Sequence, residues 1–178
     1  SVAATLVEQI DHLSKIAADF SQFANIGNTN TTLFDLHEII NSLKDLYLPY
    51  HNVQFKWNPL GRPVMIKADK TQMNRRTTNL FHNAVEAAED EKACTITVNE
   101  VLDETKILVS VSDNGMGILP EMQAKIFAPN FTTKSSGTGL GLAMCKSIVE
   151  QAHGKIWFET QIGKGTTFFV ELPVINGQ

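Results

Sequence analysis

The spacing of apolar residues predicts a long amphipathic helix at the start of the chain. Between residues 5 and 26, apolar side chains recur at alternating intervals of four and three, the pattern of a coiled-coil seam: Leu6, Ile10, Leu13, Ala17, Phe20 and Ala24. A polar stretch, residues 25–30, separates this helix from the rest of the chain. A helix docked on its own domain is one interpretation. The polar linker favours the other, one arm of a dimerising helical bundle.

The next segment predicts short strands around an amphipathic helix. Strands are expected at 31–34, 53–57 and 64–66, where polar and apolar residues alternate or apolar residues cluster. Asp35 is expected to cap the intervening helix, with Glu38 completing a capping box, and Pro49 stops it.

A long helix is predicted from about 70 to 88, with two distinct faces. Its apolar face consists of Met73, Leu80, Phe81, Ala84, Val85 and Ala88. A polar stripe has the same helical spacing: Gln72, Arg76, Asn79, Asn83 and Glu86. Asparagine is a poor helix-interior residue, so two on one stripe invite a functional explanation, although a solvated face is the usual one.

The C-terminal half predicts an antiparallel sheet interrupted by two helices and a polar loop. Strands are expected at 95–98, 107–112, 155–160 and 166–172. A short helix is expected at 120–126, and a longer helix at 139–153 ends with Gly154 as its C-cap residue. The polar segment 127–136 has the composition of a mobile lid.

Composition narrows the class of protein. Hydrophobic residues make up 43% and charged residues 19%, with a net charge of −4, as in globular domains. No basic patch is dense enough for nucleic acid, and no apolar run approaches the ~20 residues of a membrane span. Cys94 and Cys145 have no metal-type spacing and are expected to be reduced packing residues. The chain begins with Ser1 and no signal peptide is visible, so an excised fragment is expected.

Two glycine-rich stretches carry the candidate chemistry: Asp113-Asn114-Gly115-Met116-Gly117-Ile118 and Gly137-Thr138-Gly139-Leu140-Gly141-Leu142. Glycine permits close approach of a ligand to the main chain, and free N–H groups at a helix start attract phosphate. Asp113 is either an ordinary loop cap or an acceptor for an adenine amino group. Neutral oxygens of Asn83, and of Asn79, suit a magnesium ion that a triphosphate already coordinates. The P-loop and dinucleotide fingerprints are both absent.

Together with two further stretches, these two closely resemble four ordered boxes of sensor histidine kinases. The further stretches are Asn79-Leu80-Phe81-His82-Asn83-Ala84 and Ile126-Phe127-Ala128-Pro129-Asn130-Phe131-Thr132-Thr133-Lys134. Gly165-Thr166-Thr167-Phe168 resembles the closing element of the same family. The resemblance covers about residues 31–174. It implies the GHKL (Bergerat-type) α/β sandwich, an α+β fold in which helices cover one face of a mixed, mostly antiparallel sheet. ATP and Mg²⁺ are the implied cofactors.

The resemblance also implies residue roles. Asn83 is the expected magnesium ligand with Asn79 in support, and Asp113 the expected adenine contact. Lys134 is expected near the phosphates as a catalytic residue, with a solvated lid charge an equal alternative. Phe127 and Phe131 anchor the lid, and Thr166 reaches the adenine side through water. The remaining expected nucleotide-binding residues are Gly115, Gly117, Ile118, Thr132, Thr133, Gly137, Thr138, Gly139, Leu140, Gly141 and Leu142.

The chain departs from the family pattern in two places. The family's phosphoacceptor lies in an H-E-x-x-x-P-like setting, which no histidine here has. We therefore expect residues 1–28 to be the second helix of a truncated dimerisation and phosphotransfer hairpin, with 29–178 as the ATP-binding domain. Arg76 and Thr77 replace small or aliphatic residues, and we expect Arg76 to reach solvent past the sheet edge, with a phosphate contact as the less favoured alternative. Glu86 is not expected to contact phosphate.

The favoured function is the catalytic part of a sensor histidine kinase, a cytoplasmic portion that joins a membrane only through segments upstream of this chain. It would transfer the γ-phosphoryl group to a histidine for relay to a response regulator receiver domain, and would form a homodimer through the N-terminal helix. The first rival is a GHKL ATPase machine, whose glutamate base would stand where Asn79 does. The second is a non-enzymatic nucleotide-binding dimerisation module.

Overall fold

A computed structural model describes residues 2–24, 30–47, 49–50, 52–86, 93–129 and 141–175. Five helices and seven strands lie in these ranges. The helices are α1 Val2–Ala24, α2 Leu36–Tyr47, α3 Lys70–Glu86, α4 Pro120–Gln123 and α5 Gly141–Gln151. The strands are β1 Thr32–Asp35, β2 Val53–Trp57, β3 Met65–Ala68, β4 Cys94–Leu102, β5 Lys106–Asp113, β6 Lys155–Gln161 and β7 Gly165–Pro173.

The main sheet has five strands in the order β2-β4-β5-β7-β6. Among these described strands, β2 and β4 pair in parallel, and the other three pairs are antiparallel. A separate antiparallel pair, β1 with β3, lies beside it. In the register of β4 with β5, Ile96 lies opposite Asp113, which places Asp113 at the end of the sheet where β4 begins.

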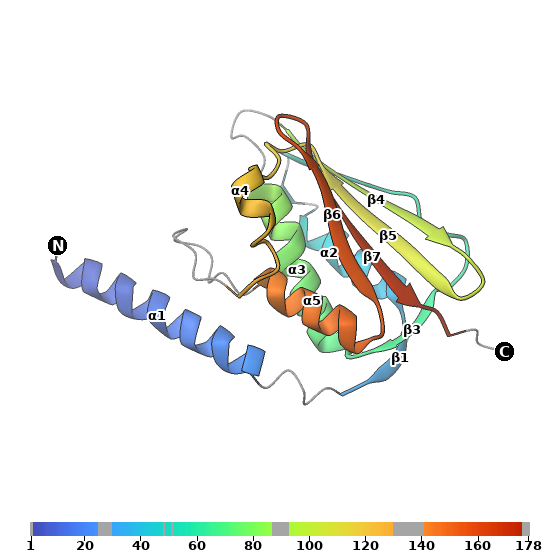
Figure 1. The fold of residues 1–178 in the computed structure, drawn as a ribbon, viewed down its shortest axis with the longest axis horizontal. Helices are drawn as coiled ribbons and strands as arrows, with labels where there is room; N and C mark the ends of the chain where they lie inside the picture. The colour runs from blue at the N-terminus through green and yellow to red at the C-terminus, as the bar shows by residue number, and fades with distance from the viewer. Residues whose placement is uncertain are drawn as a thin grey trace.

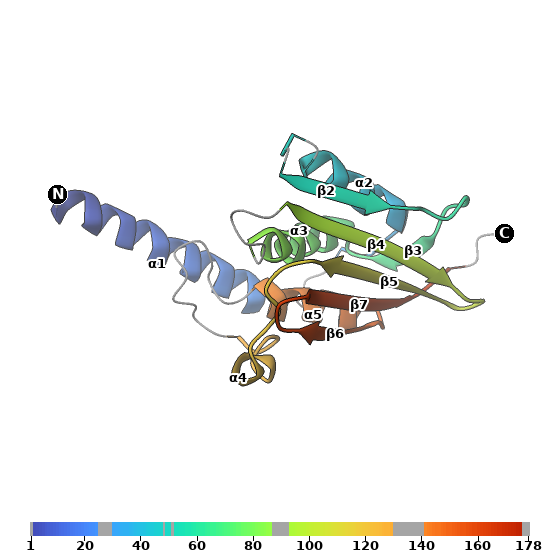
Figure 2. The same cartoon turned by 90° about the horizontal axis from the view of Figure 1, so that it is seen from above.

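The helices α2, α3 and α5 cover one face of the main sheet, as Figure 1 and Figure 2 show from two directions. The core lies between the two layers. Its fully buried side chains include Ile39 and Leu43 of α2, Met73 of α3, and Ile96 and Ile107 of the sheet. The predicted α+β sandwich, with a mixed, mostly antiparallel sheet and helices on one face, is confirmed.

Helix α1 extends away from the sandwich (Figure 1). Three of its predicted seam residues are largely exposed: Leu6 by 58%, Ile10 by 60% and Leu13 by 61%. Among the described residues, no helix combines the length and apolar character needed to span a bilayer.

Two predicted helix caps differ in detail from the structure. Asp35 does cap α2, because its Oδ1 accepts the His37 N–H at 3.0 Å, but Glu38 forms an ion pair with Lys70 at 2.7 Å in place of a capping box. At the end of α5, His153 takes the left-handed conformation with φ 63°, and the Gly154 N–H donates to the Val149 carbonyl at 2.9 Å, so Gly154 takes part in the cap as the residue after the left-handed one. Gly154 is needed for another reason: a Cβ there would collide with the Glu171 carbonyl.

Candidate functional site

Asp113 ends β5 as a half-buried carboxylate held by backbone donors. Its Oδ1 accepts the Gly115 N–H at 2.9 Å and the Thr166 N–H at 3.2 Å. These two donors come from the glycine-rich turn after β5 and from the start of β7. One carboxylate oxygen is therefore fixed by the fold, which orients the second.

Two glycines allow close backbone contacts between the turn after β5 and the β6–β7 turn. Gly165 has φ 127°, and a side chain there would collide with the Asp113 carbonyl. Gly117 has φ 82°, and a Cβ would lie 2.7 Å from the Gln161 carbonyl oxygen. Both conformations are strained for residues with a side chain. The turn after β5 and the β6–β7 turn can thus pack against each other around Asp113.

The hydroxyls of Thr160 and Thr166 form a pair beside Asp113, and only Thr166 was predicted as a site residue. Thr166 is 5% exposed, and its hydroxyl lies 2.9 Å from that of Thr160. The Thr160 hydroxyl also accepts the Ile118 N–H at 2.9 Å. Thr160 was missed because nothing in a single strand reveals its neighbour. The available signal was the predicted β6–β7 hairpin, which sets Thr160 opposite Thr166.

Asn114 connects the glycine-rich turn to the beginning of β4. Its side chain donates to the Ala93 carbonyl at 3.0 Å and accepts the Thr95 N–H at 2.9 Å. Because β4 comes after α3 in the chain, these bonds place the Asp113 turn at the end of the sandwich where α3 finishes. The backbone of Asn83 lies in the last turn of α3, near this end. The side chain of Asn83 lies outside the described residues.

Asn79 lies against the start of α5. A Cβ added at Gly141 would lie 3.4 to 3.6 Å from the Asn79 side chain. The predicted N box on α3 and the second glycine box at the start of α5 are therefore adjacent in space, although they are far apart in the sequence. The structure brings Asn79 and Gly141 together at the N-terminus of a helix, where an anion is stabilised.

Phe127 lies where a lid would join the sandwich. Its ring centroid is 5.9 Å from that of Phe158 and 6.3 Å from that of Phe168, and Lys146 lies over it at 5.8 Å. Ile118 and Leu142 also pack on the core. The remaining predicted residues of the lid and second glycine box lie outside the described residues: Phe131, Thr132, Thr133, Lys134, Gly137, Thr138, Gly139 and Leu140.

Arg76 does not reach solvent, so that prediction is wrong. The side chain is 3% exposed, and its Nη2 donates to Gln72 Oε1 at 3.3 Å. Its charge also acts on Cys145 of α5, because it lowers the pKa of that buried thiol. The guanidinium thus lies between α3 and α5. The physical reason is that α5 covers the part of the polar stripe that the sequence alone assigned to solvent.

Burial and hydrogen bonds shift the pKa of Asp113 in opposite directions. Burial raises the pKa of Asp113 above its ordinary value, and the N–H bonds from Gly115 and Thr166 lower it in part. Within the described residues, no three His, Cys, Asp or Glu side chains gather so that they could hold a metal ion. Amide oxygens on α3 are suited to an ion that arrives with its own phosphate ligands.

Comparison with known proteins agrees with this geometry. The family described as histidine kinase-, DNA gyrase B-, and HSP90-like ATPase matches residues 68–176. The sensor histidine kinase ZraS of Klebsiella oxytoca is 34% identical over 180 residues, which cover 99% of this chain and 38% of that protein. Sporulation kinase B of Bacillus subtilis is 28% identical over 94% of this chain and 40% of its own length. The chain thus spans less than half the length of these relatives.

Solved structures give the same result. The nucleotide-free catalytic domain of histidine kinase ThkA has a TM-score of 0.71 and 34% identity, covering 82% of this chain and 98% of that domain. The chain belongs to the histidine kinase-, DNA gyrase B-, and HSP90-like ATPase family. Within it, the predicted resemblance to the ATP-binding domain of sensor histidine kinases is confirmed.

Proposed function

We propose that this chain is the ATP-binding catalytic part of a sensor histidine kinase, with 1–28 as the end of a phosphotransfer hairpin and 29–178 as the catalytic domain. The reaction is transfer of the ATP γ-phosphoryl group to a histidine that lies outside this chain. The observation that carries the proposal is the Asp113 carboxylate, with one oxygen held by two backbone N–H groups beside a Thr160–Thr166 hydroxyl pair. A fixed acceptor in such a polar setting can discriminate adenine from guanine.

The other residues have roles in binding and orientation. Asn83 would hold magnesium with support from Asn79, and the ion would neutralise phosphate charge when bound. The start of α5 at Gly141 would face the phosphates with its N–H groups. Lys134 would add a positive charge from the lid. Positioning and charge neutralisation are the main protein contributions to phosphoryl transfer.

The proposed partners are a response regulator receiver domain and a second copy of the same protein. Histidine kinase ThkA has been solved in complex with response regulator protein TrrA, and it has a TM-score of 0.72 and 29% identity over 93% of this chain and 49% of that chain. That likeness supports a receiver-domain partner. The exposed apolar seam of α1 supports association with another helix.

A titration of ATP–magnesium tests the nucleotide site. Asp113→Ala removes the proposed adenine acceptor, and we expect it to weaken binding tenfold or more, ~1.4 kcal/mol. Calorimetry on purified chain measures the affinity. Asp103→Ala is the matched control, because Asp103 lies in the turn before β5, at the far end of the strand from Asp113. Equal affinities for Asp113→Ala and the wild type would refute the adenine contact.

A second experiment separates the kinase from its rivals. A helix that carries a histidine in an H-E-x-x-x-P-like setting is joined to the start of this chain, and the fusion is incubated with γ-labelled ATP. We expect acid-labile phosphoprotein, and the same fusion with its histidine replaced by Gln as the control should give none. Steady ATP hydrolysis without label would favour the ATPase machine. Binding without label or hydrolysis would favour the non-enzymatic module.

A further inference from the structure

Asp69 binds two separate segments of backbone with its two carboxylate oxygens. Oδ1 accepts the Gln72 N–H at 3.0 Å, which caps the first turn of α3. Oδ2 accepts the Asn30 N–H at 2.9 Å, 39 residues away in the chain. Asn30 is the first described residue after α1. Asp69 is itself 8% exposed. A single buried side chain therefore joins α3 to the chain arriving from α1.

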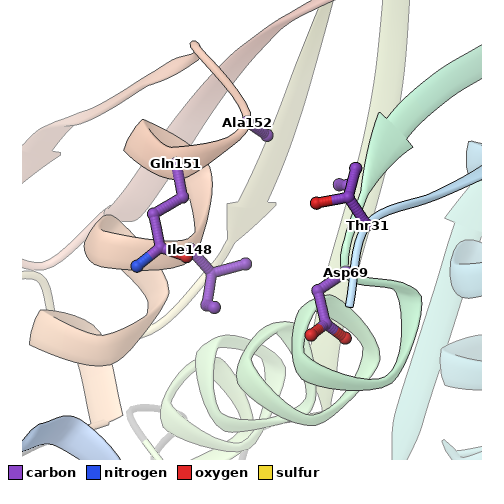
Figure 3. Close-up of a pocket in the computed structure, with 6 residues that line it drawn as sticks. Thr31, Asp69, Ile148, Gln151 and Ala152 are labelled. Carbon is purple, nitrogen blue, oxygen red and sulfur yellow. The ribbon is translucent and has the colours of Figure 1, made fainter. Parts of the chain in front are cut away.

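A small cavity lies beside this contact. It has a volume of about 20 Å³ and is lined by Thr31, Ala68, Asp69, Ile148, Gln151 and Ala152. Figure 3 shows Thr31 and Asp69 on one side of the hollow and the end of α5 on the other. Regular pairing of β1 with β3 begins only at Thr32. At this point the chain arriving from α1 is joined to the start of α3 by the hydrogen bond from the Asn30 N–H to Asp69.

The two helices that meet here also form the candidate nucleotide site with their other parts. The end of α5 lines the cavity near the start of α3, whereas the start of α5 contacts Asn79, further along α3. The helices therefore run in opposite directions and are packed together by buried residues such as Met73 and Ile148. Packed helices therefore connect the cavity to the part of the pair that carries Asn79 and Gly141.

We propose that Asp69 is a positioning residue that couples the chain arriving from α1 to the nucleotide site through the α3–α5 pair. The coupling rests on the proposed function, since it requires that nucleotide binds at Asn79 and Gly141. Linkage makes the effect reciprocal: nucleotide must change the stability of the Asp69–Asn30 contact by the same factor as that contact changes nucleotide affinity.

Substitutions can separate this role from simple helix capping. A cap needs one oxygen, so Asp69→Ser retains the bond to Gln72 and loses the second oxygen that binds Asn30. Asp69→Ala loses both bonds. Asn30→Ala is the matched control, because the donor at position 30 is the backbone N–H and the Asn30 side chain is exposed. We expect Asp69→Ser to melt close to the wild type and Asp69→Ala to melt lower.

Amide hydrogen exchange at residue 30, measured by NMR with and without saturating ADP–magnesium, tests the coupling. We expect Asp69→Ser to speed exchange at this amide by about tenfold, and nucleotide to change wild-type exchange by about fivefold, the lower end of typical couplings. The nucleotide effect should vanish in Asp69→Ser and persist in Asn30→Ala. ADP affinity should differ between the wild type and Asp69→Ser by the same factor.

The outcomes separate the proposed coupling from the proposed nucleotide-binding function on which it rests. If ADP–magnesium perturbs resonances around Asp113 but leaves exchange at Asn30 unchanged, the coupling is refuted and the nucleotide site stands. If ADP–magnesium perturbs no resonance, both are refuted. If Asp69→Ser exchanges at residue 30 like the wild type, the Asp69 contact does not hold the arriving chain, and the inference fails whatever the nucleotide does.

Discussion

At Asp113, the proposed binding of adenine and the stability of the fold favour opposite protonation states of one carboxyl group. Burial raises its pKa above the ordinary value of 3.8, so the folded chain binds the proton more tightly than the unfolded chain does. The contribution of Asp113 to stability is therefore fully present below pH 3.8 and is lost as the pH rises through the folded-state pKa. The ionised carboxylate that we propose as the adenine acceptor therefore opposes folding at neutral pH.

Replacing this carboxylate by an amide should relieve the penalty. In Asp113→Asn, Oδ1 still accepts from Gly115 and Thr166, but no charge is buried. We expect its free energy of unfolding to rise relative to that of the wild type as the pH increases from about 4 to 7. Its affinity for nucleotide should be lower than that of the wild type. Urea unfolding across that range measures the difference. A pH-independent difference would contradict the pKa shift.

Asp103 supplies a control of opposite sign. Its pKa is lowered, first by the Thr105 N–H and then by the Lys106 N–H. Its stabilisation is therefore present above pH 3.8 and is lost as the pH falls through the lowered pKa. Asp103→Asn should be less stable than the wild type at pH 7, and the deficit should shrink in acid.

At the scale of elements, the contact of α3 with α5 contains a buried charge. Arg76 is 3% exposed between the two helices, and burial raises the pKa of Cys145 to about 12, with the Arg76 charge lowering it in part. A thiol with that pKa is unreactive while the helices stay together. The rate at which Cys145 is labelled thus reports opening of α5 from α3.

Arg76→Ala should open this contact. The loss of packing volume is expected to cost about 2 kcal/mol or more in the free energy of unfolding, whereas Arg76→Leu keeps most of the volume and should cost less. Urea unfolding gives the energies, and labelling by a thiol reagent at pH 8 gives the opening rate. Cys94, buried at the start of β4, is the internal control. Faster labelling of both cysteines would indicate global unfolding.

The elements that periodicity predicted well are those whose neighbours lie close in sequence. The predicted strands of the β6–β7 hairpin differ from the observed bounds by a residue at some ends, because alternation and a glycine turn are local signals. The burial of Arg76 could not be predicted from α3 alone, since it depends on where α5 packs. Thr160 could not be predicted for the same reason, because its role depends on hydrogen bonds of its hydroxyl with Ile118 and Thr166.

For the molecule as a whole, the sandwich is a closed unit and α1 is not. The sandwich buries its apolar residues between sheet and helices, whereas the α1 seam exposes Ile10 by 60% and Leu13 by 61%. The four boxes support the prediction of one site because their order and spacing are specific together. The proposed link between the chain at Asn30 and that site was not predictable, since the Asp69–Asn30 contact joins residues 39 apart that carry no motif.

The exposed seam predicts self-association of the intact chain through α1. Ile10→Glu with Leu13→Glu places charges in the seam, and we expect it to shift the chain from dimer to monomer in sedimentation equilibrium. Glu8→Ala is the control, because Glu8 lies off the seam and should leave the dimer intact. Nucleotide affinity should stay within about twofold in both variants, since the proposed site lies wholly in the sandwich. A wild-type chain that remains monomeric at tens of micromolar would contradict self-association through α1. A seam variant that loses nucleotide binding would show that the seam also acts on the sandwich.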